Sequence, residues 1–180
     1  RRQRQMCIRD RDERVKLSVW TQIVRLKIER QCKFLRELNL QQSELLEKYL
    51  DEVDEGDLTN REGHSAKVYF NALFGLPFKR GDDTFINSAL NYGYAILLSA
   101  FNREIVSCGY NTQLGIAHKN EFNFFNLSCD FIEPFRILVD RFVFGSVEEM
   151  SAQYKHELCN ILNQTVSVSY THLRAHETSQ

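Results

Sequence analysis

Residues 13–38, ERVKLSVWTQIVRLKIERQCKFLREL, decide the fold of this chain. Apolar side chains recur there at mixed steps of three and four residues, and charged residues stand between them. The apolar members are Val15, Trp20, Ile23, Val24, Ile28, Phe34, Leu35 and Leu38. Because an α-helix completes one turn about every 3.6 residues, this spacing places these apolar side chains on one face of the helix. It predicts a long helix over 13–38 that buries one apolar stripe against other helices.

Helical periodicity continues along the rest of the chain, and no run of residues alternates as strands do. We predict further helices over 43–53, 60–74, 83–102, 128–144 and 147–163, and a short helix followed by a turn over 103–115. Only Pro77 and Pro134 interrupt the chain, and proline is the residue that most disrupts helices. The predicted fold class is therefore all-α, with one helical domain over 12–167 that is long enough to bury its own core.

Local signals mark several helix ends. Ser43 is a candidate N-cap of the helix over 43–53, and Asp83 or Thr84 opens the helix that runs to about residue 102. Gly109 fits a C-terminal cap. Gly93 lies inside a helix, where glycine costs about 1 kcal/mol relative to alanine, so we expect a close helix crossing there.

The two ends of the chain differ from the rest. Residues 1–11 and 168–180 resemble translated adapters of a transposase-based sequencing library, which would make the chain a fragment of a longer protein. The alternative is a basic N-terminal arm and a polar C-terminal tail. Without these ends, six of the 23 basic and two of the 24 acidic residues are lost, and the formal net charge becomes −5. Binding to a polyanion would then depend on local basic patches.

Cysteine use and hydropathy exclude several classes of protein. The four cysteines between the two ends form no CxxC pair, so a zinc knuckle is not expected, and reduced thiols fit a cytoplasmic protein. No apolar run approaches the roughly 20 residues that span a bilayer, so we expect no membrane partner.

Three residues define the predicted chemistry: Glu62, His118 and Glu133, spaced 56 and 15 residues apart. Two carboxylates and one imidazole form a ligand set suited to Mg²⁺ or Mn²⁺. Such an ion suits phosphodiester chemistry, because it polarises a phosphoryl oxygen and activates a hydroxyl or water. Asp130 shares a helix face with Glu133. It is an auxiliary metal ligand, a residue that orients a ligand, or a helix N-cap.

Two of these residues also have structural interpretations. Thr59 and Glu62 fit a capping box, in which the Glu62 carboxylate would accept from the Thr59 amide. A lone histidine is more often structural than catalytic, although Lys119 and Asn120 place His118 at a polar edge. Sequence pattern alone leaves both alternatives open.

The segments around the three residues resemble the catalytic domain of the CRISPR spacer-acquisition integrase, the first of the CRISPR-associated proteins, and most resemble its type II lineage. The matching stretches are NREGHSAKVYF (60–70), LGIAHKN (114–120) and LSCDFIEPFR (127–136), supported by FINSALNYGY (85–94) and GYNTQLG (109–115). The resemblance covers 57–144, roughly half of the chain. It implies that only the C-terminal helical domain is present and that the β-rich N-terminal domain of the family is missing.

The resemblance implies a metal-dependent DNA endonuclease and integrase. In that family a 3′-hydroxyl of incoming protospacer DNA attacks a phosphodiester of the CRISPR repeat by transesterification, which inserts a new spacer. Glu62, His118 and Glu133 would hold Mg²⁺ or Mn²⁺. The candidate DNA contacts are Arg61, Lys67, Lys119 and Arg136, with Arg80 as a further candidate, and each of them could instead be a solvated or ion-paired residue. The implied partners are DNA, a second copy of the chain, and the second, smaller CRISPR adaptation protein.

Two other functions remain open at this point. A non-catalytic helical nucleic-acid-binding or scaffold module would not need the three residues to converge. A structure-selective, metal-dependent nuclease would use the same site with water in place of a DNA hydroxyl. Convergence of Glu62, His118 and Glu133 in one cleft therefore separates the first alternative from an enzyme, and the reaction product separates the second.

Overall fold

The computed structural model describes residues 13–145 and 150–163, and over these ranges it contains helices and no strand. The α-helices are α1 (Glu13–Glu37), α2 (Gln42–Asp51), α3 (Arg61–Phe74), α4 (Phe85–Ser107), α5 (Asn126–Ile132), α6 (Arg136–Phe144) and α7 (Ala152–Cys159). Short 3-10 helices are η2 (Glu55–Asp57), η3 (Glu133–Phe135) and η4 (Asn160–Asn163). The all-α prediction is confirmed. The predicted adapter segments, 1–11 and 168–180, lie outside the described residues.

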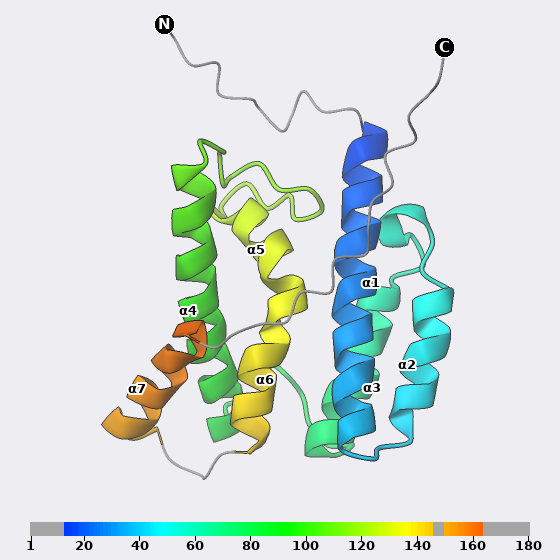
Figure 1. The fold of residues 1–180 in the computed structure, drawn as a ribbon, viewed down its shortest axis with the longest axis vertical. Coiled ribbons are helices and arrows are strands. Elements are labelled where there is room, and N and C mark those ends of the chain that lie inside the picture. The colour runs from blue at the N-terminus through cyan, green and yellow to red at the C-terminus, as the bar shows by residue number, and fades with distance from the viewer. Residues whose placement is uncertain (1–12, 146–149, 164–180) are drawn as a thin grey trace, which may run out of the picture.

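Helix α1 stands between two groups of helices (Figure 1). Helices α2 and α3 pack on one side of it, while α5, η3 and α6 contact it from the other side. Helix α4 packs on α5 and α6, and α7 packs on α4. The start of α3 and the η3 turn therefore both meet α1, although they are far apart in the sequence.

The core consists of three clusters that follow this arrangement. The first joins α1, α2 and α3 through Val24, Ile28, Leu35, Leu46 and Tyr69, and the second joins α4, α6 and α7 through Ala89, Leu90, Val139 and Leu158. The third lies where α1 meets α5, around Ile23, Ile116 and Leu127. The middle of the predicted α1 stripe is buried, whereas Val15 at its start is 45% exposed.

Helix α4 confirms two local predictions and corrects one. A Cβ atom at Gly93 would lie 2.4 Å from Val139 Cγ1, so this glycine allows α4 and α6 to cross closely. Thr84 caps the helix, since its side chain accepts from the Asn87 amide at 3.2 Å. The separate short helix expected after residue 102 does not form, because α4 continues to Ser107 before Gly109, at φ 83°, ends it.

Two other predicted caps are wrong. Ser43 lies inside α2, whose N-cap residue is Gln41 and has no side-chain cap bond. The second is the capping box of Thr59 and Glu62. The N-cap of α3 is instead Asn60, which adopts a left-handed conformation and accepts from the Gly63 amide at 3.2 Å. The helix predicted over 147–163 is observed as α7 and η4, and residues 146–149 lie outside the described residues.

Candidate metal and phosphate site

The Glu62 side chain takes no part in capping the start of α3, so it can reach a neighbouring helix. Asp57 is buried in the preceding turn and accepts from the amides of Arg61 at 2.8 Å and Glu62 at 3.0 Å. Thr59 bonds Asp54 instead of Glu62. The capping box is therefore not formed, because Asp57 and Asn60 already satisfy the first turn of α3. The Glu62 carboxylate contacts α1.

A break in the helical chain positions Glu133. Pro134 cannot donate a backbone hydrogen bond, and α5 ends at Ile132, followed by the single η3 turn and then by α6. The Arg30 guanidinium of α1 donates to the Pro134 carbonyl oxygen at 2.7 Å and ties this turn to α1. The predicted interruption at Pro134 is confirmed, and the single helix predicted over 128–144 is corrected to α5, η3 and α6. Glu133 is buried at the break, beside α1.

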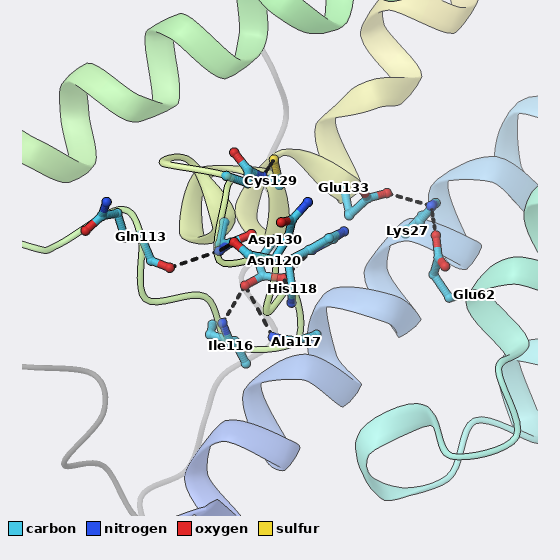
Figure 2. Close-up of polar contacts among 12 residues, drawn as sticks. Lys27, Glu62, Gln113, Ile116, Ala117, His118, Asn120, Cys129, Asp130 and Glu133 are labelled. Carbon is cyan, nitrogen blue, oxygen red and sulfur yellow. Dashed lines mark hydrogen bonds and ion pairs between the residues drawn. The ribbon is translucent and has the colours of Figure 1, made fainter. Parts of the chain in front are cut away.

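Lys27 of α1 joins the two glutamates (Figure 2). Its Nζ atom donates to Glu133 Oε2 at 2.6 Å and also bonds Glu62 Oε1. The lysine is only 6% exposed. Glu62 and Glu133, which come from opposite sides of α1, therefore converge on one positively charged atom.

Lys27 lies outside the sequence motifs around Glu62, His118 and Glu133 and was not predicted as a site residue. Lysine between apolar residues of an amphipathic helix normally faces solvent. One signal could have identified it: Lys27 follows Ile23 by four residues and Val24 by three, which is the spacing of the buried stripe itself. A charge at such a position needs a buried partner, and here it has two.

The charges at this point stabilise one another. Burial by itself would raise the pKa of Glu133, but the attraction of Lys27 and Arg136 outweighs burial and lowers that pKa. Burial would likewise lower the pKa of Lys27, but Glu133 and Glu62 raise it overall. Arg136 Nη2 lies 2.7 Å from Glu133 Oε1, so each carboxylate oxygen of Glu133 has its own cation.

His118 is held by Asp130, which is fully buried in α5. Asp130 accepts from the His118 amide at 3.1 Å and lies 2.7 Å from Nδ1 of the ring. It also accepts from the amides of Ile116 and Ala117. The hydrogen bond to Asp130 outweighs partial burial and raises the pKa of His118. The ring thus presents Nε2 as the nitrogen for a ligand.

These contacts change the predicted role of Asp130. Both of its oxygens are engaged with the backbone of the His118 loop and with the ring, and it lies in the interior instead of on the edge of a cleft. Of the alternatives stated from sequence, the geometry favours the residue that orients a ligand. Gly115 makes the loop fit around it, because a Cβ there would lie 2.1 Å from the His118 carbonyl oxygen.

The structure brings two of the three predicted ligands into one cleft. Glu62 and Glu133 line a cavity of about 570 Å³, whereas His118 lines a different hollow of about 370 Å³. Within 13–145 and 150–163, no group of three His, Cys, Asp or Glu side chains is placed to hold a metal ion. The expected convergence of all three is therefore not observed, because Lys27 stands between the glutamates and His118 is turned to Asp130.

The four predicted DNA contacts fall at three places. Lys67 and Arg136 line the cleft with the glutamates, and Lys119 lines the hollow beside His118. Arg61 lines neither, since it pairs with Glu52 at 2.9 Å and lies over the Tyr49 ring. Arg136 takes the salt bridge to Glu133 and stacks on Tyr94.

Arg80 is a further cation in the cleft wall. Its guanidinium donates to the side-chain oxygens of Asn87 and of Asn91, the latter at 2.7 Å, and it lies over the rings of Phe70 and Tyr94. All of these partners are neutral. Arg80 is thus held in place while its charge stays available to an anion in the cleft.

Asp140 lies at the bottom of the cleft and is 1% exposed. The Tyr94 hydroxyl donates to its carboxylate. Burial raises the pKa of Asp140 to about 6, in spite of the Tyr94 hydrogen bond and the positive charge of Arg136. A carboxylate that is ionised here near neutral pH destabilises the fold.

The fold and the site define an all-α domain that sets two glutamates, a buried lysine and an oriented histidine around a cleft with basic walls. The family model described as "CRISPR associated protein Cas1" matches residues 1–162. The chain therefore belongs to the Cas1 family. This match includes residues 1–11 and does not include 168–180, and the interpretation of these two ends as adapter sequence stays a prediction.

Comparisons with individual proteins agree with this family. The CRISPR-associated endonuclease Cas1 of Neisseria meningitidis serogroup C is 38% identical over 167 residues, covering 89% of this chain and 55% of the relative. The CRISPR-associated endonuclease Cas1 1 of Francisella tularensis subsp. novicida is 32% identical over 111 residues, covering 56% of this chain and 34% of the relative. The chain thus spans about half the length, or less, of these curated relatives.

A solved structure shares the fold. The structure titled "Casposase bound to integration product" superimposes with a TM-score of 0.67 over 87% of this chain and 58% of its own, at 24% sequence identity. Among the helices of the described residues, none is both long and apolar enough to cross a membrane.

Proposed function

We propose that this chain is the helical catalytic part of a type II CRISPR spacer-acquisition integrase, which joins a 3′-hydroxyl of protospacer DNA to a phosphodiester of the repeat. One observation supports this most strongly: Glu62 and Glu133 meet at a cation at the end of a cleft whose walls carry further cations. The relatives named as endonucleases, and a shared fold with a casposase that binds an integration product, support the same activity.

The donor types of the three residues fit a divalent metal, although in this structure Lys27 lies between the glutamates and His118 lines a different hollow. Two carboxylates already converge on a positive charge, and His118 has the orientation given by a carboxylate partner that metal-binding histidines usually have. We therefore assign Glu62, His118 Nε2 and Glu133 as the residues that hold Mg²⁺ or Mn²⁺. The bound ion would polarise the phosphodiester and help to activate the attacking hydroxyl.

The remaining residues of the cleft bind and orient the DNA. Lys67, Arg80 and Arg136 line the same cavity as the glutamates and would contact phosphates on either side of the reacting one. Positioning the hydroxyl and the phosphodiester in this way lowers the barrier, because the two reactants no longer need to find each other. Lys119 would contact the strand that passes His118.

The proposal extends to the intact protein. The chain would be a piece of a cytoplasmic prokaryotic protein with a β-rich N-terminal domain. That protein would act as a homodimer and bind the second, smaller adaptation protein. The fragment by itself is then not expected to complete integration.

An integration assay with a labelled DNA end and repeat DNA tests the proposal in the full-length protein. Glu62→Gln and His118→Ala should each reduce formation of the joined product by about a hundred- to a thousandfold, the scale of losing charge stabilisation in a transition state. The matched control is Glu104→Gln on the exposed part of α4, which should keep normal activity. Normal integration by Glu62→Gln would contradict the assignment of the metal ligands.

The same assay separates the alternatives. A nuclease that uses water releases cut repeat DNA without a joined product. The two relatives are named endonucleases, which favours testing this second function. A scaffold module binds the DNA but yields neither product with the wild-type protein.

A further inference from the structure

We propose that Lys27 is the resident counter-cation of this site: its ammonium group holds Glu62 and Glu133 together before a divalent ion binds, and leaves when the ion arrives. The inference rests on the proposed function, because it takes the two glutamates as metal ligands. It goes further by assigning a competing role to a residue of α1 that lies outside the motifs around Glu62, His118 and Glu133.

The surroundings of Lys27 hold its ammonium group between the two glutamates. The residues beside it on α1, Val24 and Ile28, are fully buried, so the base of the lysine is fixed in the core. Its Nζ lies 2.6 Å from Glu133 Oε2 and bonds Glu62. A buried ammonium is stable only when it is paired in this way.

The two glutamates depend on Lys27 unequally. Arg136 pairs with the second oxygen of Glu133, so Glu133 keeps a cation if Lys27 is removed. Glu62 has Lys27 as its one salt-bridge partner among the described residues. Without Lys27, two carboxylates that share one atom as a partner would face each other with less positive charge between them, and like charges at this distance repel.

A divalent ion bound by both glutamates would occupy the same position as the ammonium group. Cations so close repel each other strongly, so metal and Lys27 cannot both sit between the carboxylates. Lys27 lines the cleft, which gives the displaced side chain a place to go. There it would meet the phosphates of bound DNA. Metal binding would thus release a cation to the DNA, and each ligand would strengthen the binding of the other.

The test measures Mn²⁺ binding to the full-length protein by calorimetry and thermal unfolding, without DNA. In Lys27→Met, which keeps the length of the side chain and removes its charge, the Kd for Mn²⁺ should fall at least tenfold. The melting temperature without metal should also fall, and Mn²⁺ should raise it by more than in the wild type. The matched control is Lys33→Met, an exposed lysine on α1, which should bind Mn²⁺ like the wild type.

A second variant covers loss of folding. If Lys27→Met unfolds without metal, Lys27→Met/Glu62→Gln should fold, because it removes the unpaired carboxylate together with the lysine; failure of the double variant to fold overturns the proposal. An unchanged or higher Kd for Mn²⁺ in Lys27→Met also overturns the proposal. If the wild type itself binds no Mn²⁺, the proposed function fails first, so the two failures are distinguishable.

Discussion

At the scale of single residues, this site is built from buried charges that each have a defined partner. Asp130 fixes the loop and the ring of His118, and Lys27 fixes the two glutamates. Removing one member of such a pair leaves a buried group without a partner, which costs more than the pair contributes. We therefore expect conservative replacements to be informative here and truncations to act mainly through stability.

Asp140 gives the pH prediction at this scale. Its pKa is raised from 3.8 to about 6 by burial, so its contribution to stability is fully present below pH 3.8 and is lost as the pH rises through 6. The Asp140→Asn variant does not lose this stability as the pH rises, and its side-chain oxygen can still accept from the Tyr94 hydroxyl. The variant should gain up to about 3 kcal/mol over the wild type between pH 4 and pH 7, because one pKa unit corresponds to about 1.4 kcal/mol.

Chemical denaturation at a series of pH values checks this expectation. Asp51→Asn at the exposed end of α2 is the control and should leave the pH dependence of the wild type unchanged. A constant difference between Asp140→Asn and the wild type from pH 4 to pH 7 would show that the carboxylate is not destabilising.

At the scale of elements, two interruptions and one crossing position the site. The break at Pro134 places Glu133 beside α1, and the left-handed Asn60 starts α3 where Glu62 meets the same helix. The crossing of α4 and α6 at Gly93 lies next to Tyr94, which lines the cleft.

Gly93→Ala tests that crossing. The new methyl group would overlap Val139, so the variant should lose about 1–3 kcal/mol of stability, although alanine favours a helix. Gly93→Ala/Val139→Ala should be more stable than the sum of the two single changes predicts, because the smaller side chain makes room. Gly81→Ala is the control, since a Cβ there meets open space. Additive effects in the double variant would place the crossing contact elsewhere.

The elements also show how far sequence analysis reached. Periodicity predicted the helices, Gly93 predicted the crossing, and Pro134 predicted the break, because each is a local property of the chain. The capping box at Thr59 was wrong because Asp57 and Asn60 satisfy the first turn of α3, and Ser43 was wrong because α2 begins before it, at Gln42. Lys27 was not assigned to the site because its partners Glu62 and Glu133 lie 35 and 106 residues away in the sequence, and only the packing of α1 brings it to the cleft.

At the scale of the whole molecule, the chain is nearly neutral, with a formal net charge of −1, while the cleft wall concentrates cations. Lys67 and Arg80 have no carboxylate partner in the salt bridges of the described ranges, unlike Arg61 and Arg136. Attraction of DNA should therefore depend on this local patch and weaken as salt rises.

Replacing Lys67 and Arg80 together with alanine should flatten the salt dependence of DNA binding by the full-length protein. Each phosphate contact contributes a slope of about −0.9 in log K against log salt for duplex DNA, so the loss of two contacts should change the slope by roughly two units. The control replaces Arg36 and Lys48, which lie on exposed parts of α1 and α2. An unchanged slope in the Lys67 and Arg80 variant would mean that the DNA follows another surface.

The central claim is that Glu62 and Glu133 exchange the Lys27 ammonium for a divalent metal. Anomalous diffraction from crystals of the full-length protein at saturating Mn²⁺ tests it most directly. We predict one manganese peak within about 2.6 Å of an oxygen of each glutamate, His118 Nε2 as a third ligand, and the Lys27 side chain moved into the cleft. The absence of a peak there, with Lys27 still between the two carboxylates, would contradict the account.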